Sequence, residues 1–154
     1  MVISNTSGVL KKFKRTAWRF QVTFQTPLRD LERFVAAILA AGDDWQSSLV
    51  IIDEIVFEPE NLKALENAYF AVDQIQTGCS ISAEGNSEIS KLLRAALSDW
   101  LDFLFVPMPK PFVIYADHDE YTTFFAASKS NLNRVADSLR HNGFQMVLNY
   151  QRKF

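Results

Sequence analysis

Residues 112–150 read FVIYADHDEYTTFFAASKSNLNRVADSLRHNGFQMVLNY and indicate the fold class of the chain. Two strand-like runs, at 112–116 and 121–127, are joined by a short polar turn, which is the pattern of a β-hairpin. Ser130 then caps a helix that stops at Gly143, and the following residues alternate between apolar and polar, as in a final strand. Strands and helices that interleave in this way favour helices packed on a sheet.

The first half of the chain repeats this alternation of strand and helix. The expected elements are a half-exposed strand at 18–25, a helix from Pro27 to Gly42, a β-branched inner strand at 49–57 and a helix from Pro59.

The middle of the chain is less regular. Residues 77–83 fit either a short strand or a loop, and Asn86 or Ser87 caps a helix whose apolar stripe runs to Leu104. Three prolines at 107–111 end that helix. The sequence thus predicts an α/β (α+β) fold, a mixed sheet with helices packed on it, in the order βαβα, an uncertain segment, α, then ββαβ.

Length and composition indicate a single globular domain over residues 1–154. The chain has 48% hydrophobic and 22% charged residues, which is the balance of a protein with a packed core. Residues 1–10 are expected to form a flexible N-terminal arm. No apolar run approaches the roughly 18–20 residues that span a bilayer, and no secretory pattern is present, so a cytoplasmic location with no membrane partner is expected.

Charge is segregated along the chain, although the net charge is only −2. Residues 1–42 hold seven Lys or Arg against two Asp or Glu, whereas residues 43–102 hold three against twelve. Carboxylates at strand ends and in turns that share one face would give a docking surface for a basic partner, with aromatic residues as anchors. The candidate partner-binding residues are Asp43, Asp44, Trp45, Asp53, Glu54, Glu58, Glu60, Asp117, Asp119 and Glu120. The alternative interpretation is a solvated acidic face that keeps the chain soluble.

A basic run, Lys11-Lys12-Phe13-Lys14-Arg15, supports a different hypothesis. Four cations around one aromatic ring suit phosphate and base contacts, so a nucleic-acid-associated accessory protein is the alternative function. The overall pI of about 5.7 argues against nucleic acid as the direct partner, because domains that bind it are usually basic.

Catalytic and cofactor motifs are not found in the sequence. The chain contains no glycine-rich phosphate loop and no nucleophile elbow, and its two histidines and single cysteine do not form a zinc pattern. The acidic turn at 117–120 offers three carboxylates to a hard cation but lacks the glycine bend of a calcium loop. We therefore expect a non-enzyme with no cofactor, no metal and no small-molecule substrate, and an enzyme with a carboxylate-bound metal at this turn is the weakest hypothesis.

The hairpin, helix and closing strand of residues 111–154, together with the size and acidity of the chain, resemble bacterial immunity proteins that neutralise contact-delivered toxins. This resemblance covers about a third of the chain as a pattern and assigns no role to an individual residue. It implies a cytoplasmic inhibitor that blocks a cognate toxin domain, often a nuclease.

Overall fold

The computed structural model describes residues 1–5, 7–42, 44–69 and 75–154. Within these residues, seven strands form one sheet in the order β1-β4-β3-β5-β6-β7-β2. The strands are β1 (Val2–Asn5), β2 (Phe20–Gln25), β3 (Ser47–Glu54), β4 (Cys79–Glu84), β5 (Asp102–Met108), β6 (Val113–Ala116) and β7 (Tyr121–Ala126). The helices are α1 (Ser7–Arg15), α2 (Leu31–Ala41), α3 (Glu60–Tyr69), α4 (Gly85–Ser98) and α5 (Lys129–His141).

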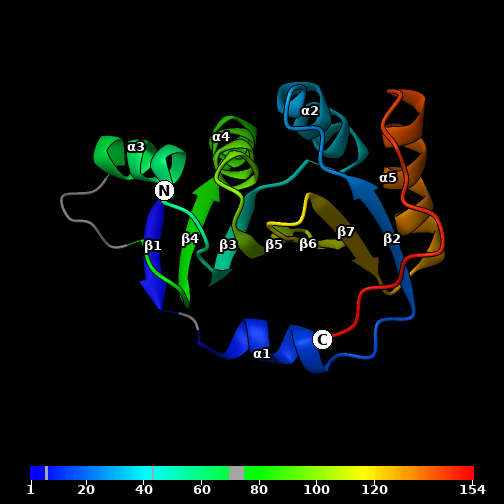
Figure 1. The fold of residues 1–154 in the computed structure, drawn as a ribbon, viewed down its shortest axis with the longest axis horizontal. Helices are drawn as coiled ribbons and strands as arrows, with labels where there is room; N and C mark the ends of the chain where they lie inside the picture. The colour runs from blue at the N-terminus through cyan, green and yellow to red at the C-terminus, as the bar shows by residue number, and fades with distance from the viewer. Residues whose placement is uncertain (6, 43, 70–74) are drawn as a thin grey trace.

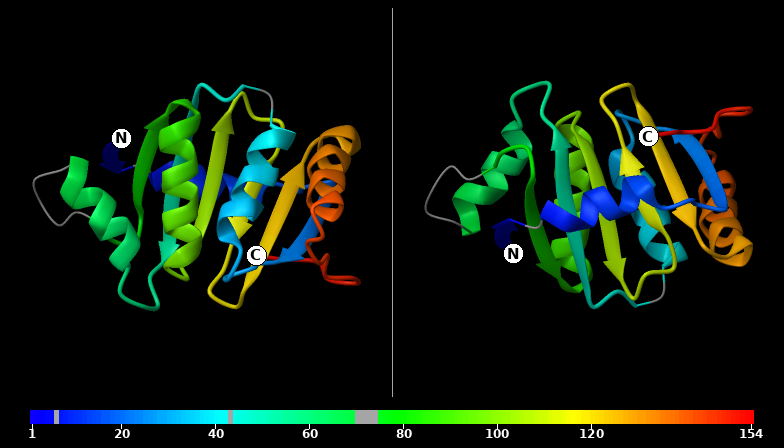
Figure 2. Two further views of the ribbon diagram at one scale, coloured as in Figure 1. Left: turned by 90° about the horizontal axis from the view of Figure 1, so that it is seen from above. Right: turned by 90° about the horizontal axis from the view of Figure 1, so that it is seen from below.

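The sheet separates two layers of unequal thickness (Figure 1). Helices α2, α4 and α5 cover one face, with α3 beside α4, while α1 crosses the other face (Figure 2). The predicted α+β class is confirmed, and every strand pairing is antiparallel among the residues that the structure describes.

Both faces of the sheet are apolar, which explains why both are covered. The main core lies under α2, α4 and α5 and contains Phe24, Phe34 and Phe103, none of which is exposed. A smaller core on the second face is closed by Phe13 of α1, which packs against Tyr115 and Phe125. Helix α1 is thus amphipathic, with an apolar side toward the sheet and a basic side toward solvent.

The largest difference from the sequence prediction is β5. The apolar stripe of α4 was expected to continue to Leu104, but the helix ends at Ser98 and a new strand begins at Asp102. Trp100 adopts a φ of 53°, in the left-handed region, which breaks the helix. The carboxylate of Asp99 also accepts hydrogen bonds from the backbone N–H groups of Asn61 and Leu62, so the end of α4 caps the start of α3.

The two ends of the chain also differ from expectation. Residues 2–5 are not a flexible arm but an edge strand paired with β4. The final strand expected from Phe144 is reduced to one bridge between Phe24 and Met146. The chain then turns at Asn149, whose φ is 57°, and its closing segment (residues 149–154) crosses to the face that carries α1.

Candidate functional site

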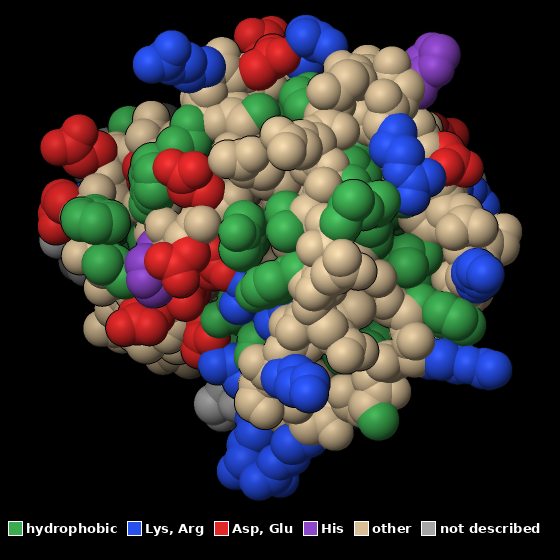
Figure 3. Space-filling model, turned by 45° about the vertical axis from the view of Figure 1, so that its right-hand side comes forward, with side chains coloured by type: hydrophobic (Ala, Val, Ile, Leu, Met, Phe, Trp, Pro, Cys, Tyr) green, Lys and Arg blue, Asp and Glu red, His purple; other side chains and the backbone are tan. Residues whose placement is uncertain are grey.

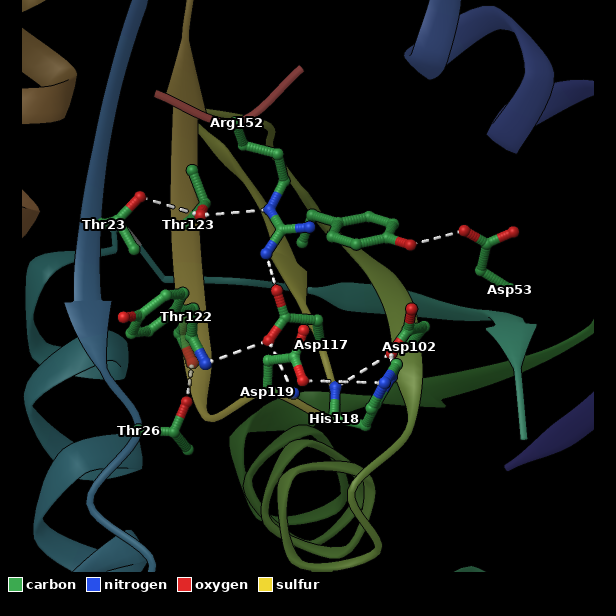
Figure 4. Close-up of polar contacts among 12 residues, drawn as sticks. Thr23, Thr26, Asp53, Asp102, Asp117, His118, Asp119, Thr122, Thr123 and Arg152 are labelled. Carbon is green, nitrogen blue, oxygen red and sulfur yellow. Dashed lines mark hydrogen bonds and ion pairs between the residues drawn. The ribbon is translucent and has the colours of Figure 1, made fainter. Parts of the chain in front are cut away.

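Three aspartates lie on neighbouring strands at one end of the second face. Asp53 and Asp102 belong to β3 and β5, which pair directly, and Asp117 follows β6, which pairs with β5. Their side chains are only 18%, 13% and 6% exposed, in that order. Asp53 lies beside Lys14, Asp102 beside His118 and Asp117 beside Arg152. Figure 4 shows the contacts of Asp102 with His118 and of Asp117 with Arg152.

Arg152 reaches this network from the closing segment. Its guanidinium forms an ion pair with Asp117, lies over the ring of Tyr115 and donates a 3.5 Å hydrogen bond from Nε to Thr123. Burial lowers the pKa of Arg152, and the nearby Asp102 opposes that shift. Asp117 also accepts backbone N–H bonds from Asp119 and Tyr121, so its carboxylate holds both the turn and the closing segment.

Asp53 joins α1 to the sheet. Its carboxylate accepts a 2.5 Å hydrogen bond from the Tyr115 hydroxyl and lies 2.5 Å from Lys14 Nζ. Burial and the negative charge of Asp53 both raise the pKa of Tyr115, so its phenol stays protonated as a donor.

Asp102 orients the single histidine of the network. Its Oδ1 accepts a 2.9 Å bond from the His118 backbone N–H and lies 2.7 Å from His118 Nδ1. The bond to Asp102 raises the pKa of His118, and the charges of Asp119 and Glu54 add to the shift. Asp119 Oδ1 lies 3.7 Å from His118 Nε2, and Glu54 is the cross-strand partner of Asp102.

We define the acidic edge as the six carboxylates at this end of the sheet. They are Asp53, Glu54, Asp102, Asp117, Asp119 and Glu120. Lys14 pairs with Asp53 and Arg152 pairs with Asp117. Glu120 shares a hollow with Arg29 and Arg33, so the negative charges of Glu54, Asp102 and Asp119 remain when His118 is neutral. Glu54 is exposed and the Asp119 side chain is 76% exposed, so these two offer the most accessible charge.

Exposed apolar side chains flank the acidic edge. Val56 and Phe57 follow β3 directly and are 41% and 58% exposed. Glu58 comes next and pairs with Lys63 at 2.5 Å, and Glu60 begins α3 in an exposed position. Of the candidate residues in the 43–60 group, Asp53 and Glu54 therefore lie at the same end of the sheet as the turn at 117–120.

The first half of that group lies elsewhere. Asp44 and Trp45 precede β3, whereas Asp53 and Glu54 end it, so the eight-residue strand holds them roughly 23 Å apart. Asp44 is exposed, but Trp45 is 3% exposed and its ring packs between Phe105 and Phe112 in the core. Trp45 therefore offers no surface to a partner, and Asp43 lies outside the described residues.

The basic run at 11–15 forms the outer side of α1. Lys11, Lys12 and Arg15 are exposed, and Lys14 pairs with Asp53. Phe13, which the nucleic-acid hypothesis uses for stacking, is 5% exposed and packs on the sheet. The run therefore presents its positive charge to solvent, but its aromatic ring is buried and not available for stacking.

Sequence reasoning did not single out several members of the network. Tyr115 and His118 are close in sequence, but they meet Asp53 and Asp102 only through the strand order β3-β5-β6. Arg152 reaches Tyr115 from the closing segment. The one usable signal was the density of charge in the turn at 117–120.

No group of three or more potential ligands that could hold a metal occurs within residues 1–5, 7–42, 44–69 and 75–154. In the same residues, every helix is too short or too polar to cross a bilayer. Comparison of the chain with protein-family models, curated proteins and solved structures found no match.

Proposed function

We propose that this chain is a binding protein that blocks a basic partner through its acidic edge. The observation that supports this proposal is the joint exposure of Glu54 and Asp119 at one end of the sheet, with the exposed Phe57 three residues after Glu54. Carboxylates that are not matched internally attract a cationic surface over a distance, and an aromatic ring supplies contact area that becomes desolvated on binding.

The partner class that fits best is a toxin domain whose own site is basic, such as a nuclease. Lys and Arg side chains that contact nucleic-acid phosphates would pair with Glu54 and Asp119 instead, and the bulk of the chain would exclude the substrate. The resemblance to immunity proteins supports the same partner class and a cytoplasmic site of action.

The test uses the toxin domain encoded beside this chain, and the absence of any such neighbour would remove the toxin from the proposal. Binding is measured by calorimetry for the native chain and for Glu54→Lys/Asp119→Lys. We expect an affinity loss of at least about tenfold, chiefly through slower association.

The matched control is Glu32→Lys/Asp44→Lys. It changes the charge by the same amount at two exposed residues, one on α2 and one at the opposite end of β3. An equal loss in both variants would mean that net charge matters and the acidic edge does not. Phe57→Ala should weaken binding without changing its salt dependence, because the ring carries no charge.

A further inference from the structure

An open hollow of about 350 Å³ lies at the end of β2 and β7 opposite the turn at 117–120, where β2 begins, α5 begins and the closing segment passes. Its volume falls at the lower end of the range of about 300–1,000 Å³ that small-ligand sites occupy. The residues that define its chemistry are Arg19, Phe20, Lys129, Asn133, Tyr150 and Gln151. We call it the basic hollow.

Two cations border the basic hollow without a matching carboxylate. Arg19 and Lys129 are exposed, and neither pairs with an acid among the residues that the structure describes. The Arg19 guanidinium lies over the Phe20 ring with 5.3 Å between Cζ and the ring centroid, so it is held at the rim. An anion in the hollow would meet two positive charges that are not already neutralised.

An aromatic ring and two amides complete the lining. Tyr150 is 36% exposed, and Tyr121 and Arg152 both pack against its ring, at 5.0 Å and 5.9 Å. The ring is therefore fixed before a ligand arrives, which lowers the entropic cost of stacking. Asn133 and Gln151 are exposed and can donate and accept hydrogen bonds, as base edges require.

The positive charge continues beyond the hollow. Lys153 follows Gln151 by two residues, and Phe154 packs on Phe13 of α1 with ring centroids 5.1 Å apart. The exposed Lys11, Lys12 and Arg15 of α1 therefore extend the same surface. Figure 3 shows Lys and Arg side chains along the lower part of the molecule, some of them directly against the acidic group around the histidine.

The other hollows of the described surface lack this combination. The one at the start of α2 is lined by Arg29 and Arg33, but Asp30 and Glu120 balance their charge. The one between α3 and α4 holds Lys91 and Arg94 without an aromatic ring. The hollow between α3 and α4 therefore provides a control that tests the effect of positive charge without an aromatic ring.

We propose that the basic hollow binds one nucleotide of a single-stranded nucleic acid. The base stacks on Tyr150, the phosphate lies between Arg19 and Lys129, and the strand continues along the closing segment to α1. The acidic pI does not oppose this site, because Arg19 and Lys129 lie at the end of β2 and β7 opposite the acidic turn at 117–120. Arg152, which packs on Tyr150, also pairs with Asp117. Base stacking on an aromatic ring together with a cationic track is the usual basis of single-strand binding.

The test is fluorescence anisotropy of a labelled twelve-nucleotide single strand of mixed sequence, as RNA and as DNA, at low salt. Arg19→Glu/Lys129→Glu should weaken binding at least about tenfold, whereas the charge-matched control Lys91→Glu/Arg94→Glu should change it less than about threefold. Tyr150→Leu should weaken binding at least about fivefold, and Tyr150→Phe should restore it, because stacking needs the ring and not the hydroxyl.

Four results would overturn the proposal. These are no binding by the native chain at low salt, an equal effect of the two charge-reversed pairs, native affinity in Tyr150→Leu, and binding to vesicles of anionic phospholipid in preference to the strand. A mononucleotide that competes with the strand at millimolar concentration would support the assignment of a single-nucleotide site.

Discussion

The Tyr115 hydroxyl donates a 2.5 Å hydrogen bond to Asp53 across the intervening strand β5. The same carboxylate holds Lys14 of α1, so one aspartate connects β6, β3 and the helix that closes the second face. The stability of this face therefore depends on a few polar contacts around the smaller apolar core.

Tyr115→Phe should lower the free energy of unfolding by about 2 kcal/mol, because it removes a hydrogen bond to a charged group at a buried position. Urea denaturation followed by circular dichroism measures the change. Tyr121→Phe is the control, since no described residue hydrogen-bonds the Tyr121 hydroxyl, and it should stay within about 0.5 kcal/mol of the native chain. Equal effects of the two substitutions would contradict the role given to Asp53.

Arg152→Met should destabilise the fold by about 3 kcal/mol. It leaves the Asp117 carboxylate, which is 6% exposed, without its cation. Adding Asp117→Asn should recover part of the loss, because the buried negative charge is then removed. Lys153→Met, at an exposed neighbouring position, should be nearly neutral. If the double variant is as unstable as the sum of its single substitutions, the two side chains are not coupled.

The stability of the fold should depend on the protonation of His118. Asp102 first, and then Asp119 and Glu54, raise the pKa of His118 above its ordinary value of 6.5. The stabilisation is therefore complete below about pH 6.5 and disappears as the pH rises through the folded-state pKa. We therefore expect the melting temperature to fall as the pH rises above about 6.5, in addition to the effect of any other group that titrates there.

His118→Gln should reduce this pH dependence, whereas His141→Gln should leave it intact. His141 is exposed at the end of α5 and forms no ion pair with an acid among the residues that the structure describes. A native-like pH profile in His118→Gln would refute the assignment to the contact with Asp102.

Gly42→Ala and Gly8→Ala should change stability in opposite directions. A Cβ at Gly42 would lie 2.4 Å from the ring of Trp45, so the buried ring must shift, at a cost of about 1–3 kcal/mol. A Cβ at Gly8 meets nothing within 4 Å and lies in α1, so alanine there should add about 0.5 kcal/mol. Thermal unfolding of both variants measures whether each substitution raises or lowers the stability. Stabilisation by Gly42→Ala would contradict the packing of Trp45.

Elements with a clear period were predictable. The alternation around Phe24 and the helical spacing around Leu132 give β2 and α5, because these patterns place apolar side chains on one side of the element. The hairpin of β6 and β7 followed from its polar turn, and its register is regular. The run 101–106 was misassigned, since an apolar stretch of that length carries no period that separates helix from strand.

The candidate site was only partly predictable. Glu54 and Asp119 lie at the same end of the sheet, but Asp44 lies at the other end of β3 and Trp45 lies in the core. Charge density along the chain indicates how many carboxylates a region holds. It does not indicate whether these carboxylates lie at the same end of the sheet as the turn at 117–120. It also does not indicate which of them form ion pairs with Lys or Arg.

The sequence by itself determined the local elements and the excess of acid in the middle of the chain, because both depend on neighbouring residues. Only the tertiary structure decided which charges meet. The antiparallel order β3-β5-β6 brings Asp53, Asp102 and Asp117 together, and the turn at Asn149 brings Arg152 onto them. Such contacts join residues far apart in the chain, so they follow from strand register and not from sequence spacing.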